Sequence, residues 1–280
     1  MVNVGNNSYV SKLHECDIIS LMRPKILVFL SIITVLVFAV LLTLPRPEKR
    51  VLGTESQSIV TTKPVINKVS IKIDTKEYVV AWKFVDNLEK LELLPNFSQK
   101  QPALEVFEFE QCKVLTSAGF YTKDDKPTGL FTTDGKTTRK FSQNSLTNGV
   151  LSINYFGIPR ITATTPEDPL RIAIQVGPVL IDNAEIRKLS LVNDSEDRRI
   201  VAGVTGENKL IFIAFYDPES VYLGPKLVDL PNAIGRFEEK TKIQIADAIN
   251  LDGGTASTFY TSEVKLSEIQ NVGAFFCEKN

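Results

Sequence analysis

Residues 250–257 read Asn-Leu-Asp-Gly-Gly-Thr-Ala-Ser and bring a carboxylate, an amide and two glycines together at one turn. They continue an apolar segment, residues 243–251, that we expect to form a buried strand. Strand alternation places Asn250 and Asp252 on one face and Leu251 on the other. This stretch is therefore the first candidate for a reaction site.

The turn after Asp252 has the residue types of an anion-binding site. Gly253 and Gly254 let the backbone bend sharply and approach a ligand closely. Successive N–H groups of such a turn can surround an anion, and the hydroxyls of Thr255 and Ser257 add donors. An ordinary strand that ends in an Asp-Gly turn has the same sequence, so both interpretations stay open here.

Composition narrows the chemistry that is available to the chain. Of its 280 residues only one is a histidine, His14, which precedes a long apolar segment at residues 26–44. The domain after that segment therefore has no Ser-His-Asp triad, no Cys-His pair and no zinc site with histidine ligands. Acid–base chemistry there must use Asp, Glu, Lys, Tyr or Cys. The net charge of −1 lacks the basic excess of nucleic-acid binders, so we expect no nucleic-acid partner.

Three further motifs precede residues 250–257. In chain order they are Ser117-Ala-Gly-Phe-Tyr121 with Lys126-Pro-Thr-Gly-Leu130, then Gln175-Val-Gly-Pro178, then Asp197-Arg-Arg-Ile-Val-Ala-Gly203. This set resembles the signatures of the phosphodiester glycosidase family over residues 69–259. The sequence departs from the family pattern at Ser117, where the family has Asn, at Ile200, where it has Thr or Asn, and at Thr255, where it has a third Gly.

The resemblance implies a hydrolase that cleaves a sugar from a sugar-1-phosphodiester, and we expect an envelope glycan as the substrate. It implies that Asp252 acts as nucleophile or base, because a nearby carboxylate stabilises the oxocarbenium character of the breaking bond. It implies that Arg199 binds the phosphate, whose oxygens fit a guanidinium fork. The other motif residues are assigned to substrate binding: Asn250, Gly253, Gly254, Ser257, Gln175, Ser117, Gly119 and Tyr121.

Each of these residues also has a purely structural interpretation. Arg199 could form a surface ion pair with Asp197, while its neighbour Arg198 is expected to be solvated. Gln175 could serve only to satisfy backbone groups within an apolar strand. The motif glycines, Gly119 among them, fit backbone requirements, and Tyr121 and Lys126 fit structural or exposed positions.

No cofactor is expected. Asp252, Asn250 and the turn carbonyls could hold Ca²⁺, but no acidic cluster at ligand spacing supports a metal site. The departures at Ser117 and Thr255 keep a second function open, a non-catalytic glycan-binding or scaffolding module outside the cytoplasm on the same fold. A membrane-tethered protein that binds another envelope protein is a third interpretation.

Residues 26–44 predict a membrane-spanning helix. They hold 19 residues without a charge, which is about the length that crosses a bilayer core. Three basic residues precede the segment and three follow it, so charge alone does not orient it. The family resemblance places the long C-terminal part outside the cytoplasm. We therefore expect a tail (1–25), a single anchor (26–44), a linker (45–67) and a domain (68–280).

The domain is expected to be strand-rich α+β (mixed α/β). Alternating or apolar runs predict strands at residues 68–74, 78–84, 107–110, 149–155, 171–181, 200–204, 209–216 and 243–251. One helix is expected over residues 227–237, with Pro231 in its first turn. Cys112 and Cys277 could form one bridge or remain two buried thiols, and their spacing does not decide between these.

Overall fold

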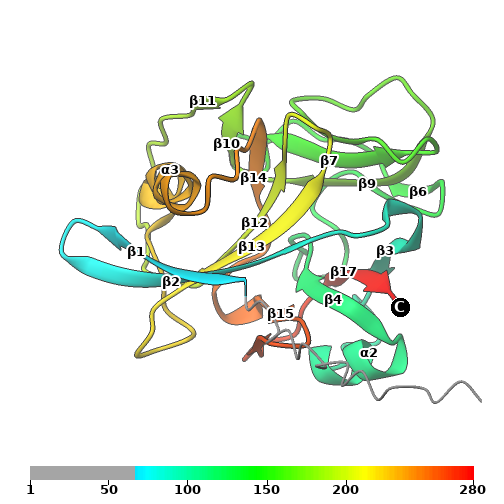
Figure 1. The fold of residues 1–280 in the computed structure, drawn as a ribbon. Helices are drawn as coiled ribbons and strands as arrows, with labels where there is room; N and C mark the ends of the chain where they lie inside the picture. The colour runs from blue at the N-terminus through cyan, green and yellow to red at the C-terminus, as the bar shows by residue number, and fades with distance from the viewer. Residues whose placement is uncertain (1–66) are drawn as a thin grey trace, which may run out of the picture. The chain divides into compact units, whose positions relative to one another are not determined.

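The computed structural model describes residues 67–280. This part of the chain is mostly antiparallel sheet with two α-helices (Figure 1), so the expected strand-rich, mixed domain is confirmed. The predicted membrane segment at residues 26–44 lies outside the described residues. From residue 67 onward, no helix has the length and apolar character needed to cross a membrane.

The largest sheet in the described part has seven strands in the order β1-β2-β13-β12-β14-β10-β11. In chain order they are β1 (Lys68–Ile73), β2 (Lys76–Phe84), β10 (Val179–Asp182), β11 (Glu185–Ile186), β12 (Arg199–Val204), β13 (Leu210–Tyr216) and β14 (Asp247–Asn250). The helix α3 (Leu230–Thr241) follows the short 3-10 helix η3 (Leu227–Asp229) and packs its apolar side, including Phe237, against this sheet. Pro231 lies in the first turn of α3, as predicted.

Two five-stranded sheets complete the described domain, in the orders β16-β15-β4-β17-β3 and β6-β5-β9-β7-β8. The first contains β3 (Leu91–Pro95), β4 (Cys112–Ser117), β15 (Phe259–Tyr260), β16 (Lys265–Leu266) and β17 (Ala274–Lys279). The second contains β5 (Phe131–Thr133), β6 (Lys136–Arg139), β7 (Gly149–Asn154), β8 (Pro159–Thr162) and β9 (Leu170–Val176). Further 3-10 turns are η2 (Leu88–Lys90) and η4 (Gly254–Ala256).

One apolar core joins the three sheets. Its buried members include Ala202 of β12, Phe212 of β13, Phe131 of β5, Leu151 of β7 and Phe276 of β17. The large sheet therefore uses both faces, one against this core and the other against α3. Because β12 and β13 are buried along their whole length, their sequences are almost continuously apolar from Ile200 to Val204 and from Leu210 to Tyr216.

The prediction of a strand at residues 107–110 is wrong. These residues end the helix α2 (Ala103–Phe109), which packs on β4. Four alternating residues are too few to separate the two periods, and the decisive burial lies earlier, at Ala103 and Val106, three residues apart on one helix face. Phe109, within this stretch, is 82% exposed at the end of the helix.

Two other predicted strands have different bounds in the structure. Residues 171–181 form β9 and β10 rather than one strand, because the chain leaves one sheet after Val176 and enters another at Val179. Residues 243–251 contribute only β14, since the regular pairing with β12 runs from Asp247 to Asn250. Both breaks lie next to predicted site residues, where the chain leaves regular pairing.

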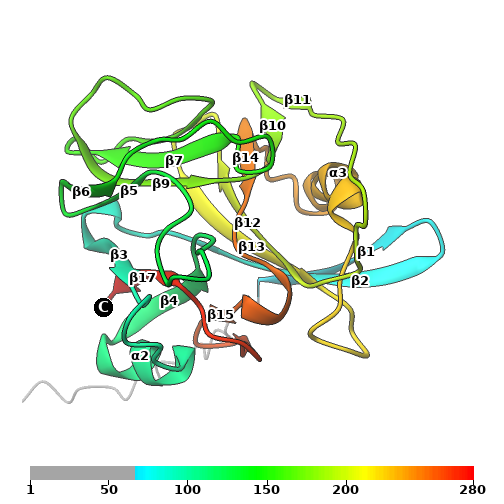
Figure 2. The same cartoon turned by 180° about the vertical axis from the view of Figure 1, so that it is seen from behind.

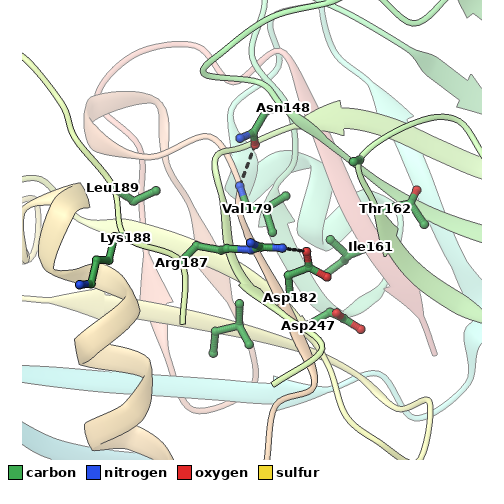
Figure 3. Close-up of a pocket in the computed structure, with 11 residues that line it drawn as sticks. Asn148, Ile161, Thr162, Val179, Asp182, Arg187, Lys188, Leu189 and Asp247 are labelled. Atoms are coloured by element: carbon green, nitrogen blue, oxygen red, sulfur yellow. Dashed lines mark hydrogen bonds and ion pairs between the residues drawn. The ribbon is translucent and has the colours of Figure 1, made fainter. Parts of the chain in front are cut away.

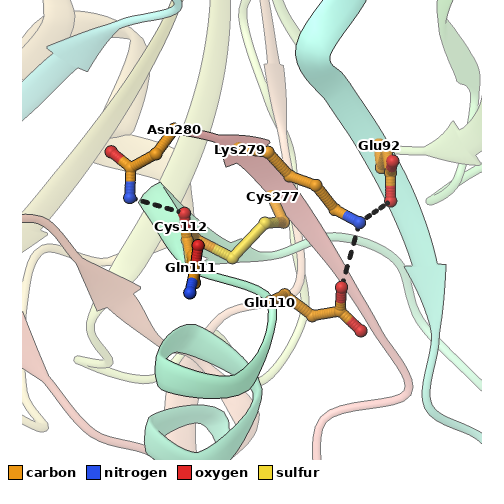
Figure 4. Close-up of a disulfide and its surroundings, with 7 residues drawn as sticks. All are labelled: Glu92, Glu110, Gln111, Cys112, Cys277, Lys279 and Asn280. Atoms are coloured by element: carbon orange, nitrogen blue, oxygen red, sulfur yellow. Dashed lines mark hydrogen bonds and ion pairs between the residues drawn. A yellow bond between two sulfur atoms is a disulfide. The ribbon is translucent and has the colours of Figure 1, made fainter.

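Cys112 and Cys277 form a disulfide, the alternative that the sequence left open. The bridge joins the start of β4 to β17, near the C-terminus (Figure 4). Beside it, Lys279 forms ion pairs of 3.0 Å with both Glu92 and Glu110. The last strand is thus tied covalently and electrostatically to segments far away in sequence.

Candidate active site around Asp252

The chain leaves the large sheet at the end of β14 (Figure 2), and Asp252 lies two residues after this strand. The N–H group of Asp252 donates to the carbonyl of Ala118 at 3.1 Å, and its own carbonyl accepts from Ser117 Oγ at 2.7 Å. One residue earlier, the N–H of Leu251 donates to Ile200 O at 2.8 Å. The ends of β4 and β12 therefore fix the backbone of Asp252 from two sides.

Asn250 ties the same segment to the turn between β9 and β10. Its N–H donates to Pro178 O at 3.0 Å, its carbonyl accepts from Gly177 N–H at 3.1 Å, and its Nδ2 donates to Gly177 O at 3.0 Å. No group in residues 67–280 donates to Asn250 Oδ1, although this atom is buried. A buried acceptor without a partner is uncommon and marks a position where a ligand group could donate.

The carboxyl group of Asp252 is almost completely enclosed, since the residue is only 7% exposed. Burial raises the pKa of Asp252 well above the ordinary 3.8, and a hydrogen bond from the N–H of Gly253 opposes this only in part. A carboxyl group with such a raised pKa in an enclosed site is typical of catalytic acids and bases. The predicted catalytic residue therefore has an environment suited to proton transfer or to stabilising nearby positive charge.

Arg199 and Asp197 lie along the turn that follows Asp252. A Cβ atom placed on Gly253 would lie 3.8 Å from Arg199 Cδ, and one on Gly254 would lie 3.6 Å from Asp197 Cγ. The N–H of Gly254 donates to Arg198 O at 2.8 Å, and Gly254 has a φ of +65°, which a side chain would strain. Both glycine amides predicted to bind an anion are thus used within the turn, one of them on the Asp252 carboxylate.

Arg199 is buried, with an ion pair of 3.2 Å to Asp194 and a longer contact of 3.8 Å to Asp197. Its Nε donates to Pro225 O at 3.0 Å, and its Nη2 donates to Asp194 and to Ser195 O. Burial lowers the pKa of Arg199, while the two aspartates oppose the shift. No hydrogen bond within residues 67–280 uses Nη1, so this nitrogen is the part of the guanidinium without a protein partner there.

The prediction that Arg198 is solvated is wrong, because Arg198 is completely buried. Its Nε donates to Ser257 Oγ at 2.7 Å, its Nη1 to Val221 O at 3.1 Å, and its Nη2 to the carbonyls of Ser257 and Ser267. Burial lowers the pKa of Arg198 to about 10, so the group still carries its charge at neutral pH. Arg198 holds the chain after Asp252 against the large sheet, a role that a pair of adjacent arginines does not reveal in sequence.

Two predicted substrate-binding hydroxyls are used within the protein. Ser117 and Ser257 are both completely buried. The Ser117 hydroxyl donates to Asp252 O and accepts from Thr258 N–H at 3.4 Å. The Ser257 hydroxyl accepts from Arg198 and donates to Gly254 O at 2.6 Å. The structure brings both residues to the site, where these hydrogen bonds stabilise the turn that follows Asp252.

Gln175 makes four hydrogen bonds to backbone groups. Its Oε1 accepts from Leu130 N–H at 3.1 Å and Ser142 N–H at 3.0 Å, and its Nε2 donates to the carbonyls of Ser142 and Thr147. A Cβ on Gly129 would lie 2.1 Å from Gln175 Oε1, and one on Gly119 would lie 2.3 Å from Ile174 Cδ1. These contacts agree with the structural interpretation of Gln175, in which its side chain satisfies backbone groups. The two glycines leave space for the side chains of β9.

Tyr121 is half-buried, and its hydroxyl donates to Asn271 O at 2.7 Å. Desolvation raises the pKa of Tyr121, and the negative charges of Asp252 and Asp125 add to this rise. The phenol therefore lies within electrostatic range of the Asp252 carboxylate. Among the predicted substrate-binding residues, Tyr121 is the one that connects Asp252 with the surface loop at residues 121–127.

A separate pocket of about 310 Å³ lies at the opposite end of β14 (Figure 3). Its polar lining includes an ion pair between Arg187 and Asp182, with Asp247 beside them, and Asn148 accepts from the N–H of Val179 at 2.9 Å. None of the predicted site residues lines this pocket.

Within residues 67–280, no three Asp, Glu, Cys or His side chains gather closely enough to hold a metal ion.

Sequence reasoning missed Asp194 as well as Arg198. Asp194 accepts from Arg199 and from the backbone N–H groups of Leu227 and Val228, so it connects the arginine to the start of η3. A carboxylate five residues before an arginine is a weak signal by itself. Only the fold shows that a loop reaching η3 closes the site on this side.

Comparison with known proteins shows the family and the fold of the chain. Residues 110–276 match a family model described as phosphodiester glycosidase. Among curated proteins, none matches the chain significantly.

Two solved structures share the fold. One is the catalytic domain of zebrafish N-acetylglucosamine-1-phosphodiester alpha-N-acetylglucosaminidase, described as auto-inhibited by its pro-peptide. It is 16% identical, with a TM-score of 0.58 over 79% of this chain and 85% of that one. The other is a hypothetical protein from Synechocystis, 11% identical, with a TM-score of 0.50 over 75% of this chain and 61% of that one.

Proposed function

The chain belongs to the phosphodiester glycosidase family, and from this premise we propose that its domain releases a sugar from a sugar-1-phosphodiester of an envelope glycan. The observation that carries the proposal is the convergence of three separate motifs on the segment that carries the buried carboxyl group of Asp252. Residues 117–118, 177–178 and 198–200 all donate or accept hydrogen bonds along residues 250–254. A rigid, enclosed carboxyl group with a raised pKa suits the cleavage of a glycosidic bond.

In the proposed reaction, the bond between the anomeric carbon and the phosphate oxygen breaks. The phosphate oxygen keeps the electron pair, a water molecule supplies a hydroxyl group to the sugar carbon, and the remaining water proton passes through Asp252 to the solvent. Asp252 in its ionised form stabilises the positive charge that develops on the sugar, either as a nucleophile or as the base that activates water. A phosphate monoester leaves readily without a strong acid, which is consistent with a domain that has no histidine.

Arg199 supplies the positive charge for the leaving phosphate. Its Nε and Nη2 are fixed by Pro225, Asp194 and Ser195, which orients the guanidinium plane. Its Nη1 donates to a phosphate oxygen in the proposed complex. A buried charge-assisted hydrogen bond of this kind is stronger than an exposed one, because water competes less for the anion.

We propose that the domain lies outside the cytoplasm, anchored by residues 26–44. The Cys112–Cys277 disulfide supports this location, since structural disulfides persist in oxidising compartments and are rare in the cytosol. We further propose that catalysis needs no cofactor or metal ion. Chelation with EDTA then leaves the rate of sugar release unchanged, and a loss restored by Ca²⁺ contradicts this part of the proposal.

The test is sugar release by the full-length chain in detergent from a panel of sugar-1-phosphodiesters. Asp252→Asn and Arg199→Lys are expected to abolish or strongly reduce release. The matched controls are Asp74→Asn, at an exposed turn whose φ of +51° suits Asn, and Arg236→Lys, on the exposed side of α3. Release that survives Asp252→Asn at the wild-type rate excludes the proposed mechanism.

The glycan-binding module is the second candidate, and one observation favours it. The side chains of Ser117, Ser257 and Gln175 use their hydrogen bonds within the protein, which leaves fewer groups for substrate than the motifs suggest. This alternative predicts glycan binding that persists in Asp252→Asn, with no turnover in either protein. Changing Ser117→Asn then tests whether the family residue restores hydrolysis.

A further inference from the structure

A cavity of about 650 Å³ opens where β3, the loop at residues 121–127 and the β5–β6 hairpin meet. Its apolar lining includes Phe97, Pro127 and Phe131, and its basic lining consists of Lys126, Arg139 and Lys140. A volume of this size is within the range of small-ligand sites. A ligand in this cavity would therefore contact both aromatic rings and several positive charges.

The aromatic side of the cavity is built rigidly. The rings of Phe97 and Phe131 meet edge to face at a centroid distance of 5.3 Å, and Phe131 is buried. Thr133, also in the lining, donates from Oγ1 to Leu93 O at 2.7 Å, which ties β5 to β3 beneath the cavity. An aromatic surface fixed in this way suits the apolar C–H face of a sugar ring.

The basic side of the cavity has positive charge that the protein does not neutralise. Within residues 67–280, Lys126, Arg139 and Lys140 form no ion pair. The carboxylate in the lining, Asp125, is already paired with Lys100 at 2.8 Å. Three unpaired cations around one cavity favour a ligand that carries negative charge.

Tyr121 connects this cavity to the Asp252 site. Its backbone pairs with Pro127, which lines the cavity. A Cβ on Gly273 would lie 2.6 Å from the Tyr121 ring and 3.0 Å from the Phe97 ring, so both rings meet above this glycine. The negative charges of Asp252, in the site, and Asp125, in the cavity lining, both act on the Tyr121 phenol. The Tyr121 ring therefore lies next to the Phe97 side of the cavity and within electrostatic range of Asp252.

We propose that this cavity binds the neighbouring sugar-phosphate repeat of a polymeric substrate. The substrate class is then a polymer of sugars joined by phosphodiester bonds, rather than a single phosphodiester on a neutral group. The aromatic lining receives the sugar ring of the repeat, and Lys126, Arg139 and Lys140 bind its phosphate. This assignment rests on the proposed function, because it names the substrate of the same site.

The experiment measures binding and cleavage with one probe, a synthetic tetramer of N-acetylglucosamine 1-phosphate units joined by phosphodiester bonds. Binding to the full-length Asp252→Asn protein is compared with binding after the added triple change Lys126→Gln, Arg139→Gln and Lys140→Gln. The matched control adds Lys72→Gln, Lys136→Gln and Lys240→Gln, three exposed cations that do not line the cavity. Both triples change the net charge equally.

We expect the cavity triple to raise the Kd for the tetramer at least about tenfold and the control triple to leave it within about twofold. With Asp252 intact, the cavity triple should raise KM for the tetramer but leave kcat/KM for a monomeric sugar phosphodiester with a neutral aglycone unchanged. Equal tetramer affinity in both triples, or no tetramer binding to the control, overturns the proposal. Cavity-dependent binding without any hydrolysis would instead refute the proposed function and leave this assignment standing.

Discussion

At the scale of single residues, the ionised carboxyl group of Asp252 lowers the stability of the fold, yet the proposed reaction requires it. Its carboxyl group is buried at the end of β14, and its raised pKa means that ionising it costs free energy in the folded state. The carboxyl group of the unfolded chain ionises near the ordinary 3.8, and that of the folded chain ionises at higher pH. The folded state therefore loses stability as the pH rises through this interval.

Asp252→Asn is accordingly expected to stabilise the protein at neutral pH while it abolishes sugar release. Removing the buried charge should raise Tm at pH 7–8 by about 2–4 °C for each kcal/mol recovered. Below the ordinary pKa of 3.8, both proteins carry a neutral side chain and the difference should disappear. Thermal unfolding of both proteins across pH 3–8 checks this, and an equal Tm difference at all pH values contradicts it.

The same raised pKa predicts the pH dependence of turnover. If Asp252 acts in its ionised form, kcat falls as the pH drops through the pKa of the enzyme–substrate complex. Because burial raises that pKa, the acid limb should lie clearly above 3.8. The measurement is kcat for a monomeric phosphodiester between pH 3 and 9. A rate that falls only on the alkaline side would assign Asp252 the role of general acid instead.

Gln175 predicts a stability effect from a residue that a motif comparison assigns to substrate. Gln175→Leu leaves two backbone donors and two backbone acceptors without their partner, and of these the Leu130 N–H and the Thr147 carbonyl are buried. We expect a loss of about 2–4 kcal/mol in the free energy of unfolding, measured by urea denaturation. Gln143→Leu, at an exposed position of the neighbouring loop, is the matched control. Equal effects of the two substitutions would mean that the Gln175 network is not structural.

At the scale of elements, the sequence predicted the strands with strong patterns and missed the junctions between them. The long apolar runs of β2, β12 and β13 and the helical spacing in α3 identify those elements, because local periodicity and burial agree there. The short run at residues 107–110 misled, since four residues fit either period. Helix α2 is recognisable only from burial against β4.

The candidate site likewise contains residues that the sequence predicts and residues that only the fold reveals. The residues on the Asp252 segment could be predicted, because the residues that form this turn are consecutive in the sequence. The roles of Arg198 and Asp194 could not be predicted, because their partners are distant in sequence: Val221 and Ser267 for Arg198, and the start of η3 for Asp194. Contacts between distant segments depend on the sheet order, which no single stretch of sequence encodes.

Arg198 gives the prediction at this scale, because it attaches the turn of η4 to the large sheet. Arg198→Lys keeps the charge but removes the fork that donates to Ser257, Val221 and Ser267. We expect the free energy of unfolding to fall by about 2–4 kcal/mol, with a lower kcat because Asp252 loses its fixed position. Urea denaturation and turnover are measured beside Arg236→Lys, and a variant with wild-type stability and kcat refutes this role.

At the scale of the whole described domain, the Cys112–Cys277 bridge closes a loop of 165 residues that contains most of the site. A cross-link of this kind mainly limits the freedom of the unfolded chain, and its loss typically costs about 2–5 kcal/mol. The double change Cys112→Ala and Cys277→Ala should therefore lower Tm by several degrees without altering the residues around Asp252. The contribution of the bridge also depends on the compartment, because the same domain made in a reducing compartment would lack it.

The measurement is Tm of the wild type and of the double variant, each with and without a reducing agent. Reduction should bring the wild type to the value of the variant and leave the variant unchanged, because only the wild type has a bridge to lose. Turnover at a temperature well below both transitions should be equal in the two proteins, since neither sulfur atom contacts the Asp252 segment. If reduction leaves Tm of the wild type unchanged, the bridge contributes no stability, and the argument for an oxidising compartment loses its physical basis.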